Sequence, residues 1–228
     1  MKVTLFMPVL NEIEGLRVVI PRINRAWVDE ILVVDGHSTD GSREYLEACG
    51  LRVLPQKGRG TIAAWWEGFD AATGEVIVPF SPDNNSIPEL IPRLLEQMQD
   101  GVEMVVASRY KEGATSEDDN LMTSFGNWFF TRLINLLFRA QYTDALVMYR
   151  AFRKDLLPRL GFDRRRDSLF EILASIRCAK RGLRVVEIPG DEPRRIGDGA
   201  SRAHPKVVSK FSAGLLMLYY IMRERVWP

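Results

Sequence analysis

The sequence has little of the residue types that build zinc sites and disulfide frameworks. Its 228 residues include only two cysteines and two histidines. Cys49 and Cys178 lie far apart and form no CxxC pair, and neither histidine has a partner at metal-ligand spacing. This pattern excludes a disulfide scaffold and a Cys/His zinc centre. We therefore expect two reduced thiols in a cytosolic protein and no metal at His37 or His204.

A hydrophobic run long enough to cross a bilayer is also missing. The last helical pattern has an uncharged core of 12 residues, at 211–222, whereas a spanning helix needs about 20. We expect residues 203–228 to form an amphipathic helix that lies on a membrane surface, forms a dimer contact or packs back on the domain. No signal peptide pattern precedes the first apolar run, so we expect a cytoplasmic protein that is at most peripheral on the membrane.

Three widespread functional motifs are absent. The chain contains no Walker phosphate loop, no GxGxxG fingerprint and no GxSxG nucleophile elbow. It also contains no internal repeat, no low-complexity segment and no clear linker. The length suits one large α/β domain, alone or with a short appendage.

Charge is spread unevenly, although the net charge is only +1. Residues 150–228 hold 18 Lys and Arg against 9 Asp and Glu, whereas residues 1–149 hold 13 against 21. A basic C-terminal part indicates an anionic partner, such as phosphate groups, a membrane surface or nucleic acid. A solvated basic face without a partner is the alternative.

The first half alternates between short apolar runs and helical patterns. The apolar runs are KVTLFM, EILVVD, EVIVPF and EMVVAS, and the helical patterns lie near residues 12–25, 40–49, 59–72 and 88–100. This alternation predicts an α/β fold with a doubly wound, mostly parallel sheet and helices on both faces. Ligands bind such sheets at the carboxyl ends of the strands. These ends, PVLNE, DGHSTD, SPDNN and SRYKEG, are polar.

The second half is richer in helix. Residues 121–142 form a strongly apolar helical pattern that includes Trp128, Phe129 and Phe130, and residues 168–182 form an amphipathic one. The apolar helix and the last helix suit a surface that meets the acyl chains of a lipid. Core packing or a dimer interface is the alternative.

Five segments together resemble a known family. MPVLNE, ILVVDGHSTDGS, KGRGTIAAWWEGFDAATGEVIVPFSPDNNSIPE, ASRY and TDALVMYRAFRK occur in the order and at the spacings of family 2 glycosyltransferases with the GT-A fold. The resemblance is greatest to the dolichyl- or polyprenyl-phosphate sugar synthase branch and covers residues 3–202. It implies a GT-A domain at 1–202, with a nucleotide-sugar half at about 1–110 and an acceptor half at about 111–202.

The resemblance also implies an activity. We expect an inverting, metal-dependent transfer of a sugar from a UDP- or GDP-sugar donor, by single displacement at the anomeric carbon. The expected acceptor is polyprenyl phosphate on the cytoplasmic face of the membrane. With this activity in view, we expect no nucleic acid partner, whereas a homodimer remains open.

The nucleotide-binding residues follow from the same motifs. They are Pro8, Asn11, Glu12, Asp35, Lys57, Gly60 and Asp83. The family's Asp-Asp motif is reduced here, because Gly36 stands where its second acid belongs. This departure leaves the base of the donor nucleotide open.

The Asp-x-Asp motif that holds a metal on the donor diphosphate is reduced as well. Ser81 and Asp83 occupy its two positions. We expect Mg²⁺ or Mn²⁺ to be held by Asp83, Asn85, diphosphate oxygens and water. Loss of the first acid should weaken metal binding in the absence of nucleotide. The alternative is that PDNNS is only a turn.

The resemblance assigns the acceptor side to one acid and several arginines. The predicted catalytic residues are Asp144, Arg109 and Arg132. A hydroxyl acceptor needs a base, for which Asp144 is the candidate, whereas a phosphate acceptor is already anionic and needs cations instead. The arginines expected to bind the acceptor are Arg150, Arg194, Arg195 and Arg202.

Other functions remain open at this stage. Met148 stands where the family usually has glycine, and GASR replaces the usual Gly-x-Ser-Lys pattern, so a saccharide or small-molecule hydroxyl is an alternative acceptor. A decayed transferase that only binds a nucleotide sugar would explain Ser81 and Gly36. A nucleotidylyltransferase shares a similar sheet, but MPVLNEIEG lacks its Gly-rich N-terminal loop.

Overall fold

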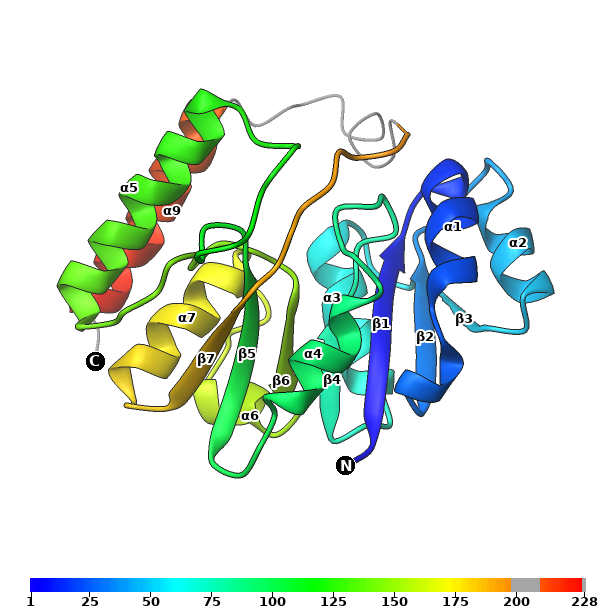
Figure 1. The fold of residues 1–228 in the computed structure, drawn as a ribbon, viewed down its shortest axis with the longest axis horizontal. Helices are drawn as coiled ribbons and strands as arrows, with labels where there is room; N and C mark the ends of the chain where they lie inside the picture. The colour runs from blue at the N-terminus through cyan, green and yellow to red at the C-terminus, as the bar shows by residue number, and fades with distance from the viewer. Residues whose placement is uncertain (198–209, 227–228) are drawn as a thin grey trace.

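A single sheet with strand order β3-β2-β1-β4-β6-β5-β7 forms the centre of the molecule (Figure 1). The computed structural model describes residues 1–197 and 210–226. The strands are β1 (Val3–Val9), β2 (Glu30–Asp35), β3 (Arg52–Pro55), β4 (Val76–Pro79), β5 (Val102–Ser108), β6 (Arg150–Arg153) and β7 (Arg184–Pro189).

The sheet is mostly parallel. β1 pairs in parallel with β2 and β4, β2 with β3, and β5 with β7, whereas β6 lies antiparallel between β4 and β5. The doubly wound, mostly parallel prediction is therefore confirmed. The antiparallel strand was not predicted, because its four residues RAFR carry a charge at each end and show no apolar run.

Helices cover both faces of the sheet, as predicted. The α-helices are α1 (Ile13–Val19), α2 (Ser42–Ala48), α3 (Thr61–Ala71), α4 (Leu90–Glu96), α5 (Leu121–Phe138), α6 (Leu156–Leu160), α7 (Phe170–Lys180) and α9 (Lys210–Val226), and short 3₁₀ turns lie at Ile20–Arg22 and Arg25–Trp27. In Figure 1, α1 and α4 lie in front of the sheet, and α3 and α7 lie behind it.

An aromatic cluster joins α3 and α7 to the rear face of the sheet. The ring of Phe69 lies 5.6 Å from Phe6, 5.5 Å from Phe152 and 5.2 Å from Phe170, measured between centroids. Gly68 allows this close approach, because a Cβ atom there would lie 2.1 Å from the Phe6 ring. Such buried aromatic contacts fix both helices against the sheet.

α5 and α9 lie side by side and run in the same direction at one end of the sheet (Figure 1). The Tyr220 hydroxyl accepts a hydrogen bond from the backbone N–H of Ser168 at 3.0 Å, and Glu224 Oε1 lies 2.6 Å from Arg177 Nη2. α9 therefore packs back on the domain, whereas a contact of its exposed side with a membrane surface or a second copy stays a prediction. In residues 1–197 and 210–226, no helix is both long enough and apolar enough to cross a membrane.

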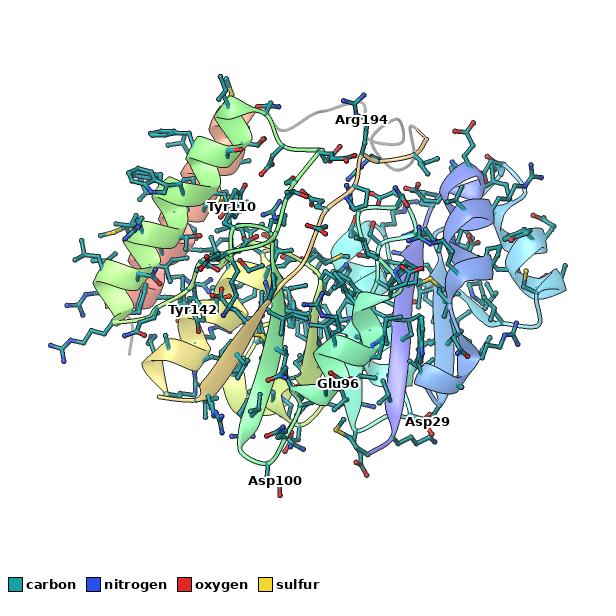
Figure 2. All side chains as sticks on the ribbon, in the orientation of Figure 1. Asp29, Glu96, Asp100, Tyr110, Tyr142 and Arg194 are labelled. Atoms are coloured by element: carbon teal, nitrogen blue, oxygen red, sulfur yellow. The ribbon has the colours of Figure 1, made fainter. Side chains whose placement is uncertain are left out.

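The outward side of this helix pair remains apolar. Figure 2 shows aromatic side chains of α5 directed away from the sheet. The exposed large apolar residues are Leu121, Met122, Phe125, Trp128, Phe129 and Leu136 on α5, and Leu215, Leu216, Leu218, Tyr219, Met222 and Val226 on α9. We call this set the apolar face.

Candidate functional site

The polar ends of the parallel strands meet at one edge of the sheet, which is the upper edge in Figure 1. The strand register aligns these ends, because Val9 of β1 pairs with Asp35 of β2, and Asp35 pairs with Pro55 of β3. The sheet therefore collects residues that lie far apart in the sequence, as expected for a doubly wound fold.

Asp35 forms the centre of the predicted nucleotide half. Its side chain is buried, and the carboxylate accepts hydrogen bonds from the backbone N–H groups of His37 and Ser38 at 3.2 Å. A Cβ atom on Gly36 would lie 3.1 Å from Gln56 Oε1. Gln56 therefore fills the space beside the missing second acid, and sequence reasoning did not single it out.

The first motif lies against the same turn. Asn11 Oδ1 accepts a hydrogen bond from the Thr39 N–H at 2.8 Å, and the Glu12 N–H donates to Ser42 Oγ at 2.9 Å. Asn11 has a φ of 56°, in the left-handed region that Asn tolerates better than most residues. Pro8 of β1 pairs with Val34, the residue that precedes Asp35 in β2. The structure thus brings the first motif to the Asp35 turn.

Lys57 and Gly60 lie in the loop that leads into α3. The backbone N–H of Lys57 donates to Glu67 Oε2 at 2.9 Å, and the Gln56 side chain donates to the Gly60 carbonyl at 2.8 Å. Gly60 has a φ of 81°, which favours glycine. Glu67 of α3 and Gln56, which lies beside the Asp35 turn, therefore hold this loop in place.

The loop after β4 carries Asp83, which is almost fully buried. Asp83 Oδ1 accepts hydrogen bonds from the Ser81 hydroxyl and from the Asn85 N–H. The second oxygen, Oδ2, lies 3.0 Å from Nη2 of Arg195. Both carboxylate oxygens of Asp83 therefore have partners, and the positively charged partner is Arg195.

The two asparagines of this loop hold a second segment in place. We call residues 190–197, which follow β7, the strap. Asn84 Nδ2 donates to the Arg194 carbonyl at 3.1 Å, and Asn85 Nδ2 donates to the Pro193 carbonyl at 3.0 Å. The Ile196 N–H donates to the Asp83 carbonyl at 2.8 Å. The side-chain amides of Asn84 and Asn85 therefore hold the strap against the loop after β4, and we call these two hydrogen bonds the clamps.

A divalent ion finds few ligands at this loop. The residues that the structure describes contain no group of three or more His, Cys, Asp or Glu side chains that could hold a metal. Ser81 offers a hydroxyl in place of a carboxylate, and Asn85 uses its amide nitrogen on the strap. Hard cations prefer several oxygen ligands. The arrangement around Asp83 does not fit a metal that the chain holds by itself.

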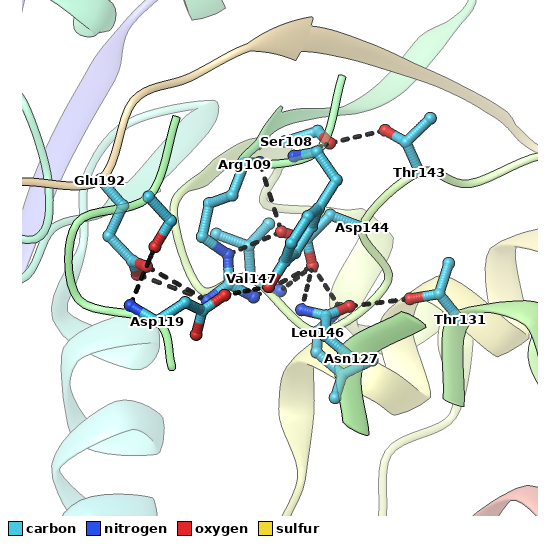
Figure 3. Close-up of polar contacts among 12 residues, drawn as sticks. Ser108, Arg109, Asp119, Asn127, Thr131, Thr143, Asp144, Leu146, Val147 and Glu192 are labelled. Carbon is cyan, nitrogen blue, oxygen red and sulfur yellow. Dashed lines mark hydrogen bonds and ion pairs between the residues drawn. The ribbon is translucent and has the colours of Figure 1, made fainter. Parts of the chain in front are cut away.

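Asp144 and Arg109 form the other polar centre, at the end of β5 (Figure 3). Asp144 is fully buried, and Arg109 grips both of its oxygens, with Nε 2.7 Å from Oδ2 and Nη2 3.2 Å from Oδ1. Asp144 Oδ1 also accepts hydrogen bonds from Asn127 Nδ2 at 3.0 Å and from the backbone N–H groups of Leu146 and Val147. The carboxylate has no free side.

This environment does not suit the predicted role of Asp144 as a general base. A base needs an accessible oxygen that can take a proton, whereas Asp144 is surrounded by donors. Burial alone would lower the pKa of Arg109, but the hydrogen bonds and charge of Asp144 and the charge of Glu192 raise it above its usual value. Asp144 therefore positions Arg109.

Glu192 of the strap completes this centre and was not predicted. Its carboxylate lies 3.4 Å from Arg109 Nη1 and accepts a hydrogen bond from Ser116 Oγ at 2.6 Å. Burial raises the pKa of Glu192, although the neighbouring charge of Arg109 acts in the opposite direction. Glu192 lies in the segment DEPRR, and nothing in the local sequence places it beside Arg109, a residue 83 positions earlier.

A pocket of about 170 Å³ lies between these two polar centres. The loop after β4, the residues before β6 and the strap form its walls. The charged residues of the lining are Arg109, Arg195, Asp191 and Glu192, and Met148 contributes an apolar side chain. Two arginines from distant parts of the chain therefore face one small space.

The remaining predicted arginines lie elsewhere. Arg150 is fully buried and donates to the carbonyls of Val147 and Glu171, so its side chain does not suit acceptor binding. Arg132 is exposed on α5, among the residues of the apolar face. Arg194 points away from the sheet (Figure 2). Arg202 and the predicted boundary after it lie outside the described residues, so both stay predictions.

Comparison with known families agrees with the geometry. A family model described as glycosyl transferase family 2 matches residues 4–161, which is more than half of the chain. The chain belongs to glycosyl transferase family 2. The family that the five sequence segments predicted is thereby confirmed.

Curated relatives match most of the chain. It is 30% identical over 189 residues to undecaprenyl-phosphate 4-deoxy-4-formamido-L-arabinose transferase of Pseudomonas fluorescens, which covers 76% of this chain and 53% of the relative. It is 28% identical over 202 residues to undecaprenyl-phosphate mannosyltransferase of Micrococcus luteus, with 83% and 82% covered. It is also 28% identical over 208 residues to dolichol-phosphate mannosyltransferase of Pyrococcus furiosus, with 83% and 56% covered. The chain thus spans little more than half the length of the first and third of these relatives, and all three names bear out the predicted polyprenyl-phosphate branch.

Solved structures show the same fold. Glucosyl-3-phosphoglycerate synthase of Mycobacterium tuberculosis, in complex with uridine diphosphate, superposes with a TM-score of 0.73 at 20% identity and covers 100% of this chain and 81% of that chain. Its complex with Mn²⁺, uridine diphosphate and phosphoglyceric acid superposes with a TM-score of 0.71 at 21% identity, with 100% and 79% covered. The GT-A fold that the resemblance implied is confirmed.

Proposed function

We propose that this chain is an inverting glycosyltransferase that moves a sugar from a nucleoside diphosphate donor to the phosphate of a polyprenyl phosphate. One observation carries the choice of acceptor. Arg109 and Arg195 line one pocket, and the predicted base Asp144 is buried and saturated with donors. A phosphate acceptor is anionic before it reacts, so it needs cations for binding and no strong base.

The relatives support this acceptor. The names of the Pseudomonas and Micrococcus proteins specify undecaprenyl phosphate, and that of the Pyrococcus protein specifies dolichol phosphate. Both of these lipids present a phosphate on a long apolar chain. Arg109 is held rigidly by Asp144, and a guanidinium binds phosphate oxygens through paired N–H donors.

The donor is proposed to bind at the carboxyl ends of β1, β2 and β4. Asp35 and Gln56 are buried there and Asn11 is half-buried, and together they form a hydrogen-bonded wall that suits a ribose or a base. Asp83 lies at the end of β4, next to the pocket that contains Arg195. The diphosphate would thus lie between Asp35 and Arg109, with the reacting sugar towards Arg109.

Metal dependence stays a prediction and is not part of this proposal. Structural neighbours were crystallised with Mn²⁺ or Mg²⁺ together with uridine diphosphate. In this chain, however, the single retained carboxylate, Asp83, is bound to Arg195.

The apolar face is proposed to rest on the cytoplasmic surface of a membrane. Its exposed aromatic and aliphatic residues come from α5 and α9, and Arg132 and Arg139 of the α5 segment are exposed as well. Apolar side chains combined with arginines suit an interface of acyl chains and anionic headgroups. A homodimer through the same face is the competing arrangement.

A hydroxyl acceptor is the second candidate, and Glu192 is the observation in its favour. Burial raises the pKa of this carboxyl group, which lines the pocket beside Arg109. A carboxylate with a raised pKa can serve as a general base.

The third candidate is a decayed protein that binds a nucleotide sugar without turnover. It predicts nucleotide-sugar binding and no transfer product.

A transfer assay separates these candidates. The purified chain is incubated with UDP- and GDP-sugars and with undecaprenyl phosphate in detergent micelles, a panel of saccharides or buffer alone, and products are identified by mass spectrometry. We expect a glycosylated lipid phosphate, and its formation should be lost in Arg109→Met. Sugar transfer to a saccharide that instead requires Glu192 would overturn the phosphate acceptor. Binding of nucleotide sugars without any product would favour the decayed protein.

A further inference from the structure

The Arg195 guanidinium contacts Asp83, the one carboxylate that is left of the reduced metal-binding motif. Its Nη2 atom lies 3.0 Å from Asp83 Oδ2, while Ser81 and Asn85 bond the other oxygen. We propose that the Arg195 guanidinium supplies the positive charge that binds the donor diphosphate, so that nucleotide binding does not need a metal ion. This inference rests on the proposed function, because it assumes a nucleoside diphosphate donor.

The local charge explains why one arginine can be enough. Two carboxylates at positions 81 and 83 would carry two negative charges, which a single guanidinium could not neutralise. Ser81 removes one of them and donates its hydroxyl hydrogen to Asp83. Arg195 then balances the single charge of Asp83, so an incoming diphosphate does not meet an unpaired carboxylate at this position. Ser81 and Arg195 therefore belong to one arrangement.

The backbone on both sides of Arg195 is already fixed. Asn85 bonds the Pro193 carbonyl at 3.0 Å, and Ile196 bonds the Asp83 carbonyl at 2.8 Å. A charged side chain that is positioned before the ligand arrives loses less entropy on binding. The strap therefore presents Arg195 to the diphosphate in a prepared orientation.

Within residues 1–197 and 210–226, donor groups of the Arg195 side chain remain available for phosphate oxygens. A guanidinium has five N–H donors, and Asp83 takes the contact at Nη2. The side chain is 42% exposed and lines the pocket that also contains Arg109. Arg109, by contrast, already donates from Nε, Nη1 and Nη2 to Asp144 and Glu192, so fewer of its five N–H groups remain for an anion. Of these two arginines, Arg195 has more capacity left for an incoming anion.

The same cation would assist the chemical step. An oxygen of the acceptor phosphate attacks the anomeric carbon, the bond from that carbon to the diphosphate oxygen breaks, and its electron pair leaves with the nucleoside diphosphate. The leaving group therefore gains one negative charge. A guanidinium beside it stabilises this charge in the transition state, which is the role that metal ions fill in many phosphate-dependent enzymes.

Calorimetric titration of the full chain with UDP and with GDP tests the inference, each in EDTA and in Mn²⁺. We expect one nucleotide to bind in EDTA with an affinity within about threefold of that in Mn²⁺. Arg195→Met should weaken this binding by about 10- to 100-fold, which corresponds to the loss of a hydrogen bond to a charged group. Arg159→Met is the matched control, because Arg159 is also 42% exposed and also pairs with a carboxylate, on the far side of the fold.

A second variant reverses the proposed arrangement. Ser81→Asp restores the acid at the first position, so binding in EDTA should fall and Mn²⁺ should recover it. The inference would be overturned if wild type bound nucleotide only with Mn²⁺, or if Arg195→Met bound as well as wild type in EDTA. If neither nucleotide bound wild type in either condition, the proposed function would fail, and this inference with it. Circular dichroism of each variant establishes that the fold is kept.

Discussion

Arg109 and Asp144 form a two-point ion pair, with Nε 2.7 Å from Oδ2 and Nη2 3.2 Å from Oδ1. Asp144 is fully buried, and the Arg109 side chain is 14% exposed. The pair therefore holds one guanidinium in a fixed orientation at the edge of the pocket. It also explains why a predicted base and a predicted phosphate ligand lie in contact: the first positions the second.

Asp144→Asn should destabilise the fold through this pair. Removing one partner of a buried ion pair leaves the other charge uncompensated, which costs about 3–5 kcal/mol. We expect the free energy of unfolding in urea to fall by an amount in this range. Arg109→Met/Asp144→Asn should be less destabilised than the sum of the single variants, because it removes both charges of this pair together. Additive effects would contradict the pairing.

Arg109→Lys should impair acceptor use more than donor binding. Lysine keeps the charge but cannot grip Asp144 at two points, so the cation is no longer oriented. We expect KM for polyprenyl phosphate to rise and kcat to fall, with the Kd of the nucleotide nearly unchanged. Steady-state kinetics combined with nucleotide titration measures both. A large loss of nucleotide affinity instead would place Arg109 on the donor side.

Asn85→Ala should loosen the strap. The variant removes the hydrogen bond to the Pro193 carbonyl, and such a bond contributes about 0.5–1.5 kcal/mol. We expect faster amide hydrogen exchange at Ile196 and a nucleotide affinity that is about two- to tenfold weaker. Gln99→Ala is a control, because Gln99 also donates to a backbone carbonyl but lies away from the strap. Unchanged exchange at Ile196 would argue against the clamp.

The attachment of α9 should weaken in acid. Burial raises the pKa values of Asp167 and Glu224, but hydrogen bonds from Arg223 and Arg177 lower both overall. A carboxyl group with a lowered pKa stabilises the fold above its usual pKa, near 3.8 for Asp167 and 4.5 for Glu224, and loses this contribution as pH falls through the folded value. We expect the free energy of unfolding to drop as pH falls from about 5 to about 3.

Glu224→Gln provides the control for this acid effect. It cannot titrate at position 224, so its free energy of unfolding should depend less on pH than that of wild type. It should also be less stable than wild type at pH 7, because Arg177 loses a buried partner. Urea unfolding at several pH values measures both effects. Parallel pH profiles for the two proteins would show that Glu224 contributes nothing to the acid sensitivity.

Phe129→Glu should weaken membrane binding if the apolar face meets lipid. Withdrawing a phenylalanine from an apolar environment costs about 1.5–3 kcal/mol, so partitioning should fall by about tenfold or more. Val18→Glu is the matched control, because Val18 is 40% exposed and Phe129 is 43% exposed, but Val18 lies on α1. Flotation with vesicles that contain anionic lipid measures the effect. Normal flotation together with loss of a dimer would favour the dimer interface.

The periodicity of the chain was sufficient to predict the sheet but not all of its order. Apolar runs such as EILVVD and EMVVAS are buried on both faces, so they identify strands regardless of what they pair with. β6 was missed because its four residues depend on neighbours from β4 and β5 for their strand geometry. The local sequence of β6 carries no information about these neighbouring strands, so it could not predict the strand.

The candidate site was predicted in its residue types more than in its contacts. Asp35, Asp83 and Arg109 stand at strand ends, and the structure collects them at one edge of the sheet. Arg150 also follows a recognisable motif, but it lies in the core and bonds backbone carbonyls. Gln56 could have been suspected, since it follows a strand directly, whereas Glu192 carried no such signal.

The sequence by itself determined the family, the parallel sheet and the reduced acidic motif at Ser81 and Asp83. Each of these can be recognised from short segments of neighbouring residues. Only the tertiary structure decided what faces Asp83. The strap returns from β7, more than a hundred residues later, and its approach depends on the clamps from Asn84 and Asn85. The ion pair between Arg195 and Asp83 joins segments that are distant in the sequence. The folding of the chain brings the two residues together, so no local sequence pattern could predict the pair.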